Sequence, residues 1–278
     1  MADYRLSGYT TEASVATDNQ NCGSVFNTTT SGDALSNWNA IRAGTEGSPS
    51  LSVNDLRILS SRTAATPRLS VRRSYIQFPI PNNLSRLDNT PILSVYTSGF
   101  YGDRKIVPTS ITYTNFTQPW SGNNATNAFT SAQTGASAKY IDDSFYYLGG
   151  GTNLITLNEL AKFHILLGGG VSSGVSYLTI ALLDYTYDFL GAVPDDGDGH
   201  SVTFDGPSDS NPPSLTLRNP WFINDKGAEF PVEGNYVIAA NDVGVNQFDR
   251  SVPQLPFSQN IRGPRSLRGK NVPYKVTT

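Results

Sequence analysis

The chain has 278 residues, and its 20 basic and 23 acidic side chains give a formal net charge of −3. This balance argues against a protein that coats nucleic acid and gives no overall attraction to a membrane surface. Charged residues make up only 15% of the sequence, which favours an extended β surface over a helical enzyme. A chain of this length can bury a large core, and all-β sandwiches of roughly 200 to 250 residues form one domain.

The N-terminal part is predicted to form short strands separated by turns. We expect a strand over residues 8–15 and a small-polar loop over 19–36. Trp38 and Ile41 are predicted to lie on a strand that turns sharply at the glycines after it. Residues 51–60 alternate apolar and polar except near Asn54, where the period of two breaks and a bulge is expected.

The second third contains a strong strand over residues 71–81. Its alternation places Val71, Arg73 and Tyr75 on one face, and Pro79 and Pro81 are expected to end it. Further strands are predicted over residues 92–98 and 105–116. The Asn/Ser/Gly-rich stretch 118–138 is too long for an ordinary connection, so it is expected to be a lid or a contact surface.

One short helix is predicted, and it is expected to close one end of the sandwich. Thr156 and Glu159 have the spacing of a capping box, and apolar residues then recur at helical spacing as far as Leu167. The glycine run 168–170 should stop the helix.

The stretch 176–188 is predicted to be the central strand. Leu178, Ile180 and Leu182 alternate with Ala181 and Leu183, so both faces are apolar, as in a strand that is covered above and below. From Asp184 to Asp188 polar and aromatic residues alternate, which predicts that the strand continues to the rim of the sheet.

Three regions are therefore predicted along the chain. Residues 1–219 form the sandwich, with its last strands at 200–206 and 213–219. Residues 220–244 form an added β-hairpin with its turn at 224–227. Residues 245–278 form an extended C-terminal arm.

The arm has six basic residues against one acidic residue, a net charge of +5. Its prolines and glycines disfavour a helix, so composition alone leaves open a disordered terminus. Spaced apolar residues instead favour an arm that becomes ordered against a neighbouring subunit. The residues expected to make these contacts are Arg262, Arg265, Arg268, Lys270, Phe257 and Tyr274.

The search for catalytic chemistry selects no residue. His164 and His200 are the only histidines, and neither lies in a nucleophile-elbow pattern, so each is expected to be a packed or solvent-facing imidazole. The glycine runs lack the context of a phosphate-binding loop. The first ten residues lack a signal core, no stretch is long and apolar enough to span a membrane, and Cys22 has no disulfide partner. We therefore expect a protein that is made in the cytosol.

The sequence Asp195-Asp196-Gly-Asp198-Gly-His200 is the most metal-like stretch. Alternate carboxylates can hold a hard cation, and Asp196 and Asp198 are the candidates. An EF-hand loop counted from Asp196 would need a glutamate at Pro207, so we expect a solvated acidic turn and neither a metal nor a cofactor.

Carbohydrate binding is the remaining chemical hypothesis, because exposed aromatic rings stack on sugar rings. Trp38, Trp120 and Trp221 are the candidates for such stacking. The alternative is that these rings lie in the core, since aromatic side chains bury the largest areas.

An ordered set of segments resembles a family of jelly-roll β-sandwiches related to carbohydrate-binding modules. RRSYIQFPIP (72–81) and PILSVYTS (91–98) are similar to the family's first two strands, although Pro79 stands where its members usually have an aspartate. Residues 174–188 and 202–217 are similar to the later strands. WNAIRAGTEG (38–47) is similar to a stretch in relatives among tailed-bacteriophage virion proteins. The resemblance covers about residues 8–218 and transfers no catalytic residue.

This resemblance implies a jelly-roll fold and a non-enzymatic structural protein of a bacteriophage virion. The expected role is capsid decoration or cement, with neighbouring copies or the major capsid protein as partners, and with no nucleic acid or membrane. The alternative is a host-attachment module of a fibre or collar that binds host glycans. A polysaccharide-degrading enzyme would need paired carboxylates, and no spacing in the sequence selects such a pair.

Overall fold

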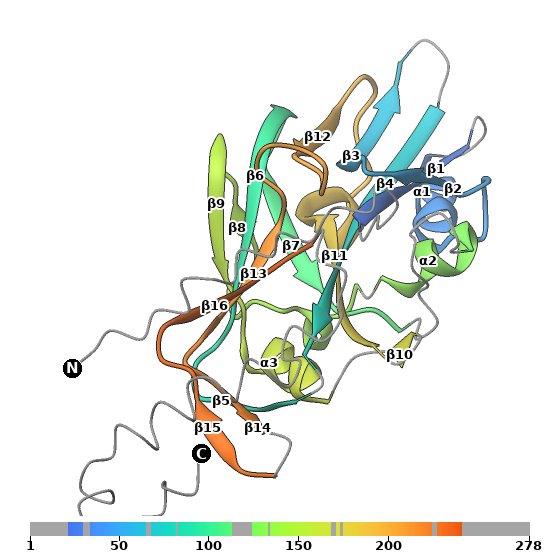
Figure 1. Cartoon of the computed structure of the whole chain (residues 1–278). Coiled ribbons are helices and arrows are strands. Elements are labelled where there is room, and N and C mark those ends of the chain that lie inside the picture. Colours follow the sequence, from blue (N-terminus) through green and yellow to red (C-terminus); the bar gives the residue numbers. More distant parts are fainter. Residues whose placement is uncertain are drawn as a thin grey trace, which may run out of the picture.

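Figure 1 shows the computed structural model of the chain, which describes residues 22–29, 34–64, 68–81, 83–112, 124–132, 134–167, 171–172, 175–223 and 227–240. The predicted strand 8–15, Trp120 and the arm 245–278 lie outside the described residues. The same holds for the six arm residues Arg262, Arg265, Arg268, Lys270, Phe257 and Tyr274.

Antiparallel strands dominate the structure, so the predicted all-β class is confirmed. The strands are β1 (Cys22–Thr29), β2 (Ser50–Val53), β3 (Leu56–Thr63), β4 (Arg68–Ile80), β5 (Leu84–Leu87), β6 (Ile92–Tyr101), β7 (Lys105–Thr109), β8 (Tyr146–Tyr147), β9 (Gly151–Thr156), β10 (Val171–Ser172), β11 (Val175–Asp184), β12 (Gly199–Phe204), β13 (Ser214–Arg218), β14 (Pro220–Ile223), β15 (Glu229–Pro231) and β16 (Asn235–Ala239). The helices are α1 (Ala34–Ala43), α2 (Ala125–Ser131) and α3 (Glu159–Leu166), with a 3₁₀ turn at Ala136–Ala138 and a π-helical turn, η3, at Tyr185–Phe189. Within the described ranges, each helix is too short or too polar to cross a bilayer.

The long strand β4 organises the sheet because three strands pair with it. β1 lies along one edge, from Leu69 to Ile76 of β4. On the opposite edge β3 pairs with β4 up to Arg72, and β11 pairs with it from Ser74 onward. The sheet therefore forks at Arg73, where the edge passes from β3 to β11 (Figure 1).

A second fork lies on β6. β9 follows one edge of β6 from Ile92 to Thr97. On the other edge β13 pairs with β6 as far as Ser94, and β12 pairs with it from Thr97 onward. The two long strands thus each belong to two branches, which lets one chain of strand pairs curve around a core instead of forming a flat sheet.

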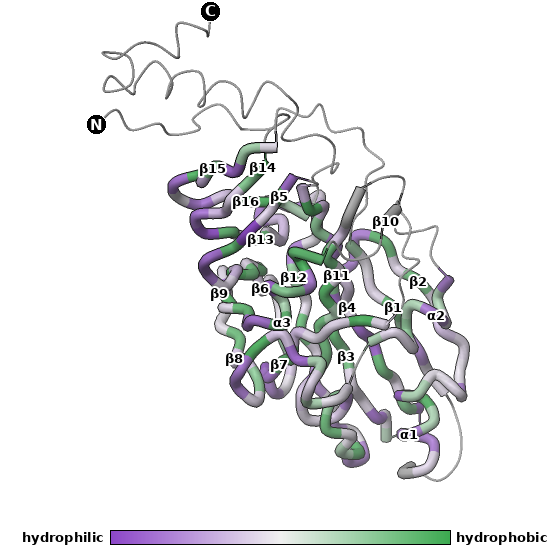
Figure 2. Tube along the Cα trace, turned by 90° about the horizontal axis from the view of Figure 1, so that it is seen from below, coloured by the Kyte–Doolittle hydropathy of each residue, from purple (hydrophilic) through white to green (hydrophobic). Residues whose placement is uncertain are grey.

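The larger hydrophobic core lies between these branches. It contains Ile58, Phe78, Val95, Ile180 and Leu215, which come from five different strands and are nearly or fully buried. A smaller core covers the opposite face of β4 and β11, beneath α1 and α2. In Figure 2, β4 and β11 cross the middle of the molecule with hydrophobic residues along them.

The strand predicted over residues 176–188 is confirmed as an interior strand as far as Asp184. β11 lies between β4 and β7. Ile180 and Leu182 face the larger core, and Ala181 and Leu183 face the smaller one. Full burial of a large aliphatic side chain contributes about 1.5–3 kcal/mol, so the two-faced pattern stabilises both layers.

Beyond Asp184 the prediction of a continued strand is wrong. The Asp184 carboxylate accepts a hydrogen bond from the backbone N of Tyr187 at 2.6 Å, and the chain turns there into η3. A side chain that caps its own backbone in this way ends a strand that the polar and aromatic alternation would otherwise have extended.

The predicted strand at Trp38 and Ile41 is also wrong, because both residues lie on α1. A spacing of three places them on one face of a helix, and both are fully buried against the smaller core. The helix ends at Gly44, whose φ of 72° suits glycine. α1 and α2 also mean that the prediction of a single helix is wrong.

The predicted helix near residues 156–167 is confirmed, although Thr156 does not cap it. Thr156 pairs with Ile92 as the last residue of β9. The cap is Asn158, whose side chain accepts a hydrogen bond from the N of Ala161 at 3.3 Å. The prediction of one bulged strand over residues 51–60 is wrong, because the chain forms two strands there: β2 ends at Val53, β3 begins at Leu56, and Asn54 between them has a φ of 58°.

The predicted added hairpin is only partly a separate unit. β14 and β15 pair as expected and form a small sheet with β5. β16, however, pairs with β13 along its whole length and extends the large sheet. Residues 235–239 therefore belong to the large sheet and not to the small one.

Candidate functional site

A buried ion pair joins the fork of the sheet to η3. The Arg73 guanidinium binds the Asp188 carboxylate in a bidentate manner, with Nε to Oδ2 at 2.8 Å and Nη2 to Oδ1 at 2.7 Å. The two side chains are 2% and 1% exposed. The remaining Arg73 donors reach the carbonyl of Phe129 at 2.6 Å and that of Arg42 at 2.8 Å.

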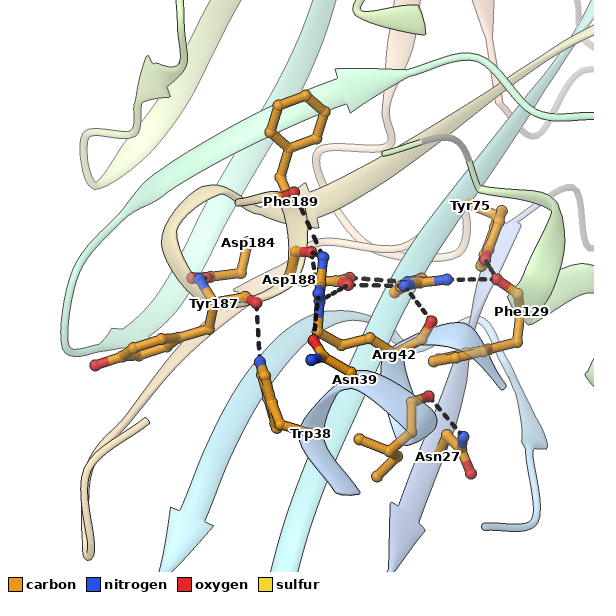
Figure 3. A network of polar contacts seen from close by, with 12 residues as sticks. Asn27, Trp38, Asn39, Arg42, Tyr75, Phe129, Asp184, Tyr187, Asp188 and Phe189 are labelled. Carbon is orange, nitrogen blue, oxygen red and sulfur yellow. Dashed lines mark hydrogen bonds and ion pairs between the residues drawn. The ribbon is translucent and has the colours of Figure 1, made fainter. Parts of the chain in front are cut away.

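A second arginine shares this carboxylate. Arg42 of α1 lies 3.7 Å from Asp188 Oδ1 and donates from Nε to the Asp188 carbonyl at 2.8 Å (Figure 3). Burial lowers the pKa of Arg42, and Asp188 opposes that effect. For Arg73 the same burial acts first, but the charge and hydrogen bonds of Asp188 outweigh it and the pKa is raised.

The hydrogen bonds around this ion pair connect several elements of the fold. Trp38 Nε1 donates to the Tyr187 carbonyl at 3.2 Å, and the Tyr75 hydroxyl donates to the Phe129 carbonyl at 3.3 Å (Figure 3). The Arg42/Arg73/Asp188 cluster therefore ties α1, α2 and η3 to β4. Backbone carbonyls accept the arginine donors that Asp188 does not, so the cluster organises the fold.

A second polar cluster lies nearer the surface and links η3 to β12. His200 Nδ1 is 2.9 Å from Asp184 Oδ2, and the Tyr187 hydroxyl donates to Asp198 Oδ2 at 2.5 Å. The rings of Tyr187 and His200 lie 4.4 Å apart. Burial lowers the pKa of His200, but the hydrogen bond and charge of Asp184, with help from Asp103 and Asp198, outweigh burial and raise it.

Beside this cluster lies an open groove of about 430 Å³. Tyr101, at the end of β6, forms one wall and is 64% exposed. The other lining residues come from β3, the residues after it and the turn before β12: Leu59, Ser61, Arg62, Thr63, Ala64, Gly197, Asp198 and Gly199. We call this space the Tyr101 groove. An aromatic ring, a guanidinium and a carboxylate meet there within reach of solvent.

The acidic run that suggested a cation has other partners. Asp196 Oδ1 is 2.9 Å from Arg62 Nε, whereas Asp198 accepts from Tyr187 and from the N of Gly199. Across the described parts of the chain, no group of three His, Cys, Asp or Glu side chains could hold a metal ion. The structure thus places Asp196 and Asp198 in separate contacts.

The two histidines lie in different environments and contact different residues. His164 Nδ1 is 2.8 Å from the Tyr140 hydroxyl, and burial lowers its pKa. His200 contacts Asp184 and Tyr187. Each imidazole is therefore held by its own packed neighbours, as the sequence analysis expected.

The structure describes two of the three predicted tryptophans, Trp38 and Trp221, and it places them in different environments. Trp38 is fully buried beneath α1, so the prediction that it stacks on a sugar is wrong. Trp221 of β14 is half-buried, donates to Asp88 at 2.8 Å and has the Arg86 guanidinium 4.1 Å from its ring centroid. Tyr101 was one of four tyrosines, with Tyr113, Tyr146 and Tyr147, that the sequence offered beside the tryptophans for sugar stacking, and nothing in the sequence distinguished it from the others.

A surface on the outside of the large sheet is the other candidate. Ile92 of β6 pairs with Thr156 and Thr216, and Thr216 pairs with Val237. Leu154 and Val237 are 60% and 53% exposed. We call this surface the open face; its residues are Thr152, Leu154 and Thr156 of β9, Ile92, Ser94 and Tyr96 of β6, Ser214 and Thr216 of β13, and Val237 and Ala239 of β16. These ten side chains are uncharged, and the charged residue next to them is Arg218, which lies on the same side of β13 and pairs with Asn235.

No protein-family model matches the sequence, and no curated protein matches it either.

Proposed function

We propose that the chain is a non-enzymatic structural protein of a bacteriophage virion, of the capsid decoration or cement type, built on a jelly-roll sandwich. The open face is the observation that carries this proposal. Monomeric proteins seldom expose a large, largely uncharged surface with aliphatic side chains. On the outer side of these four neighbouring strands the charged residue is Arg218 at the end of β13, and two strands carry exposed aliphatic side chains, which is typical of a surface that another subunit covers.

The composition of the open face fits neighbouring copies of the same chain or the major capsid protein. An uncharged surface does not repel its own copy, and its threonine and serine hydroxyls can form hydrogen bonds across an interface. Burial of Leu154, Ile92 and Val237 would supply about 25 cal/mol per Å² of apolar surface. The basic residues of the arm would add further weak contacts from the same chain, and such linked contacts strengthen one another.

The test is the solution mass by light scattering of the full chain, of a chain that ends at Gly244, and of the Leu154→Lys/Val237→Lys variant. We expect a defined oligomer for the full chain and a smaller species for the other two. Leu190→Lys is the matched control, because Leu190 is equally exposed but lies just after η3, away from the open face.

A second test of the proposal measures how much of each variant is incorporated into virus particles. Purified variants are mixed with particles that lack the protein, and bound protein is measured after sedimentation. The chain that ends at Gly244 and the double lysine variant should fail to bind. Normal incorporation of both would contradict the proposal.

The alternative, a glycan-binding module for host attachment, gains no support from the two tryptophans that the structure describes. Trp38 is buried, and Trp221 has a cation over its ring. The Tyr101 groove is the observation that still favours sugar binding.

A further inference from the structure

On the basis of the assembly role proposed above, we propose that the Tyr101 groove binds the basic segment 262–270 of the C-terminal arm of a second copy of the chain. Tyr101 pairs with Ser201, which pairs with Leu59, so the three residues form one row across β6, β12 and β3. The Tyr101 ring is 64% exposed at the end of this row, and the groove of about 430 Å³ is open to solvent beside it. A segment of another chain can therefore reach the ring.

The groove and the turn beside it carry an excess of negative charge. Asp195, Asp196 and Asp198 lie in this turn, and Arg62 is the basic residue of the groove lining. Arg62 Nε lies 2.9 Å from Asp196 Oδ1, so one of the three carboxylates is already paired. The hydrogen bond from the Tyr187 hydroxyl, at 2.5 Å, lowers the pKa of Asp198, which is therefore charged at neutral pH. Asp195 and Asp198 thus add two negative charges that a cation from another chain can neutralise.

The segment 262–270 has the complementary chemistry. Its sequence is RGPRSLRGK, with three arginines, one lysine and no acidic residue. Arginine suits a groove of this kind, because its planar guanidinium donates to carboxylates and also stacks on an aromatic ring. We expect one arginine of the segment to lie on the Tyr101 ring and to donate to Asp198, while the neighbouring basic residues face Asp195.

The acidic turn is held in place by contacts with β3. The N of Arg62 donates to the Asp198 carbonyl at 2.9 Å, and the N of Gly197 donates to the Arg62 carbonyl at 3.1 Å. A Cβ at Gly199 would lie 2.6 Å from Ser61 Cβ, so the turn packs closely against the strand. Because these contacts already order the turn, most of the conformational entropy lost on binding comes from the arm.

The length of the arm favours the groove of a second copy over that of the same copy. Ala239, near the end of β16, lies in one row with Ser214 and with Ser94 of β6. Tyr101 is seven residues further along β6, about 23 Å at about 3.3 Å per residue, so about eight extended residues would reach the groove of the same copy. The 21 residues 241–261 can span about 70 Å. This exceeds the diameter of a folded domain of this size, about 45 Å.

The first experiment measures binding of a fluorescent peptide of residues 260–272 by anisotropy. The receptor is the full-length arm variant R262S/R265S/R268S/K270S, whose own segment lacks the charges and leaves the groove vacant. We expect a dissociation constant of about 0.1 mM or below at low salt, and weaker binding as salt is added. A peptide with lysine in place of its three arginines should bind about 3-fold more weakly or worse, because it keeps the charge but loses the planar group.

Substitutions in the receptor locate the binding site. Tyr101→Ala should weaken peptide binding about 10-fold or more, since an aromatic anchor carries much of the affinity. Phe163→Ala is the matched control, because Phe163 is a similarly exposed aromatic residue on α3 that does not line the groove. Its affinity should stay within about twofold. Asp195→Asn should also weaken binding, whereas Asp142→Asn, at an equally exposed carboxylate elsewhere, should not.

A mixing experiment decides between the two possible grooves. The Tyr101→Ala chain keeps its arm and lacks the aromatic wall, whereas the arm variant keeps the groove. Each alone should form a smaller species by light scattering than the unaltered chain, and a 1:1 mixture should recover part of the oligomer mass. Lack of recovery would show that the arm binds its own groove and would overturn the choice of a second copy.

Two further results would overturn the proposal. One is peptide binding that is absent or unchanged by Tyr101→Ala. The other is a neutral oligosaccharide that displaces the peptide more readily than the unlabelled segment does, which would assign the groove to the glycan-binding alternative. The peptide assay needs no oligomer, so it still decides the role of the groove if the full chain is a monomer and the assembly proposal fails.

Discussion

Two regions on the outside of the larger core treat charge in opposite ways. On the side covered by α1 and α2, two arginines and one aspartate are enclosed at the fork of β4. On the open face, ten neighbouring positions carry no charge at all. A buried ion pair is stable only when its two partners keep one geometry, so residues of the chain itself fix the structure of the covered side. The open face contains no buried ion pair and is suited to contact with another chain.

The largest effect is expected from the covered side. Asp188→Ala would leave Arg73 buried without its carboxylate, and removal of one partner of a buried pair costs about 3–5 kcal/mol of unfolding free energy. Urea denaturation measures this loss.

Asp196→Ala is the control for an exposed ion pair. Asp196 is 59% exposed beside Arg62, so its loss should cost about 1 kcal/mol or less. If Asp188→Ala costs no more than Asp196→Ala, the buried cluster does not hold the covered side together.

An intermediate effect is expected from His200, and it depends on pH. Its folded-state pKa is raised above the ordinary value of 6.5, so the folded protein binds more protons than the unfolded chain. The stability it contributes is complete below about pH 6.5 and is lost as the pH rises through the folded-state pKa. When the free energy of unfolding is measured from pH 5 to 9, His200→Gln should remove the part of its decrease at high pH that His200 causes.

His164 provides a control of opposite sign. Burial lowers its pKa, so the unfolded chain binds its proton more readily and the stability falls as the pH drops below about 6.5. His164→Gln should therefore remove the part of the stability loss below about pH 6.5 that His164 causes. Equal slopes for both variants would show that the Asp184 contact does not control His200.

The smallest effect on stability is expected from the open face. Leu154→Lys should change the unfolding free energy by less than about 1 kcal/mol, because the side chain is exposed and lysine is tolerated on strands at the end of a sheet. The same substitution should nevertheless reduce the oligomer mass. A loss of stability as large as that of Asp188→Ala would mean that Leu154 belongs to the core.

Sequence patterns predicted the strands best where the burial of side chains alternates. The two apolar faces of residues 178–183 identified β11 as an interior strand, and this was correct because alternation directly reports on the two layers. The pattern failed at Trp38 and Ile41, since two buried residues three apart fit a helix as well as an irregular strand. It failed again after Asp184, where a side chain to backbone hydrogen bond ended the strand.

The candidate sites were much less predictable. Arg73 was visible as a charged residue on an apolar strand face, but its partner Asp188 lies 115 residues away in the chain. Tyr101 looked like any other tyrosine, and its value as a binding surface depends on its exposure beside Asp198 and Arg62. The uncharged character of the open face emerges only when four strands are placed in register.

The sequence by itself determined the all-β class, the positions of β4, β6, β11, β12 and β13, and the two-faced burial of β11, because these follow from the local period of apolar side chains. It missed β1, which lies in the predicted loop 19–36, and β9. The tertiary structure alone decided where the sheet forks, which charges are buried together and which aromatic ring remains exposed. These features depend on pairing between distant segments, and a local period contains no information about which strand lies next to which.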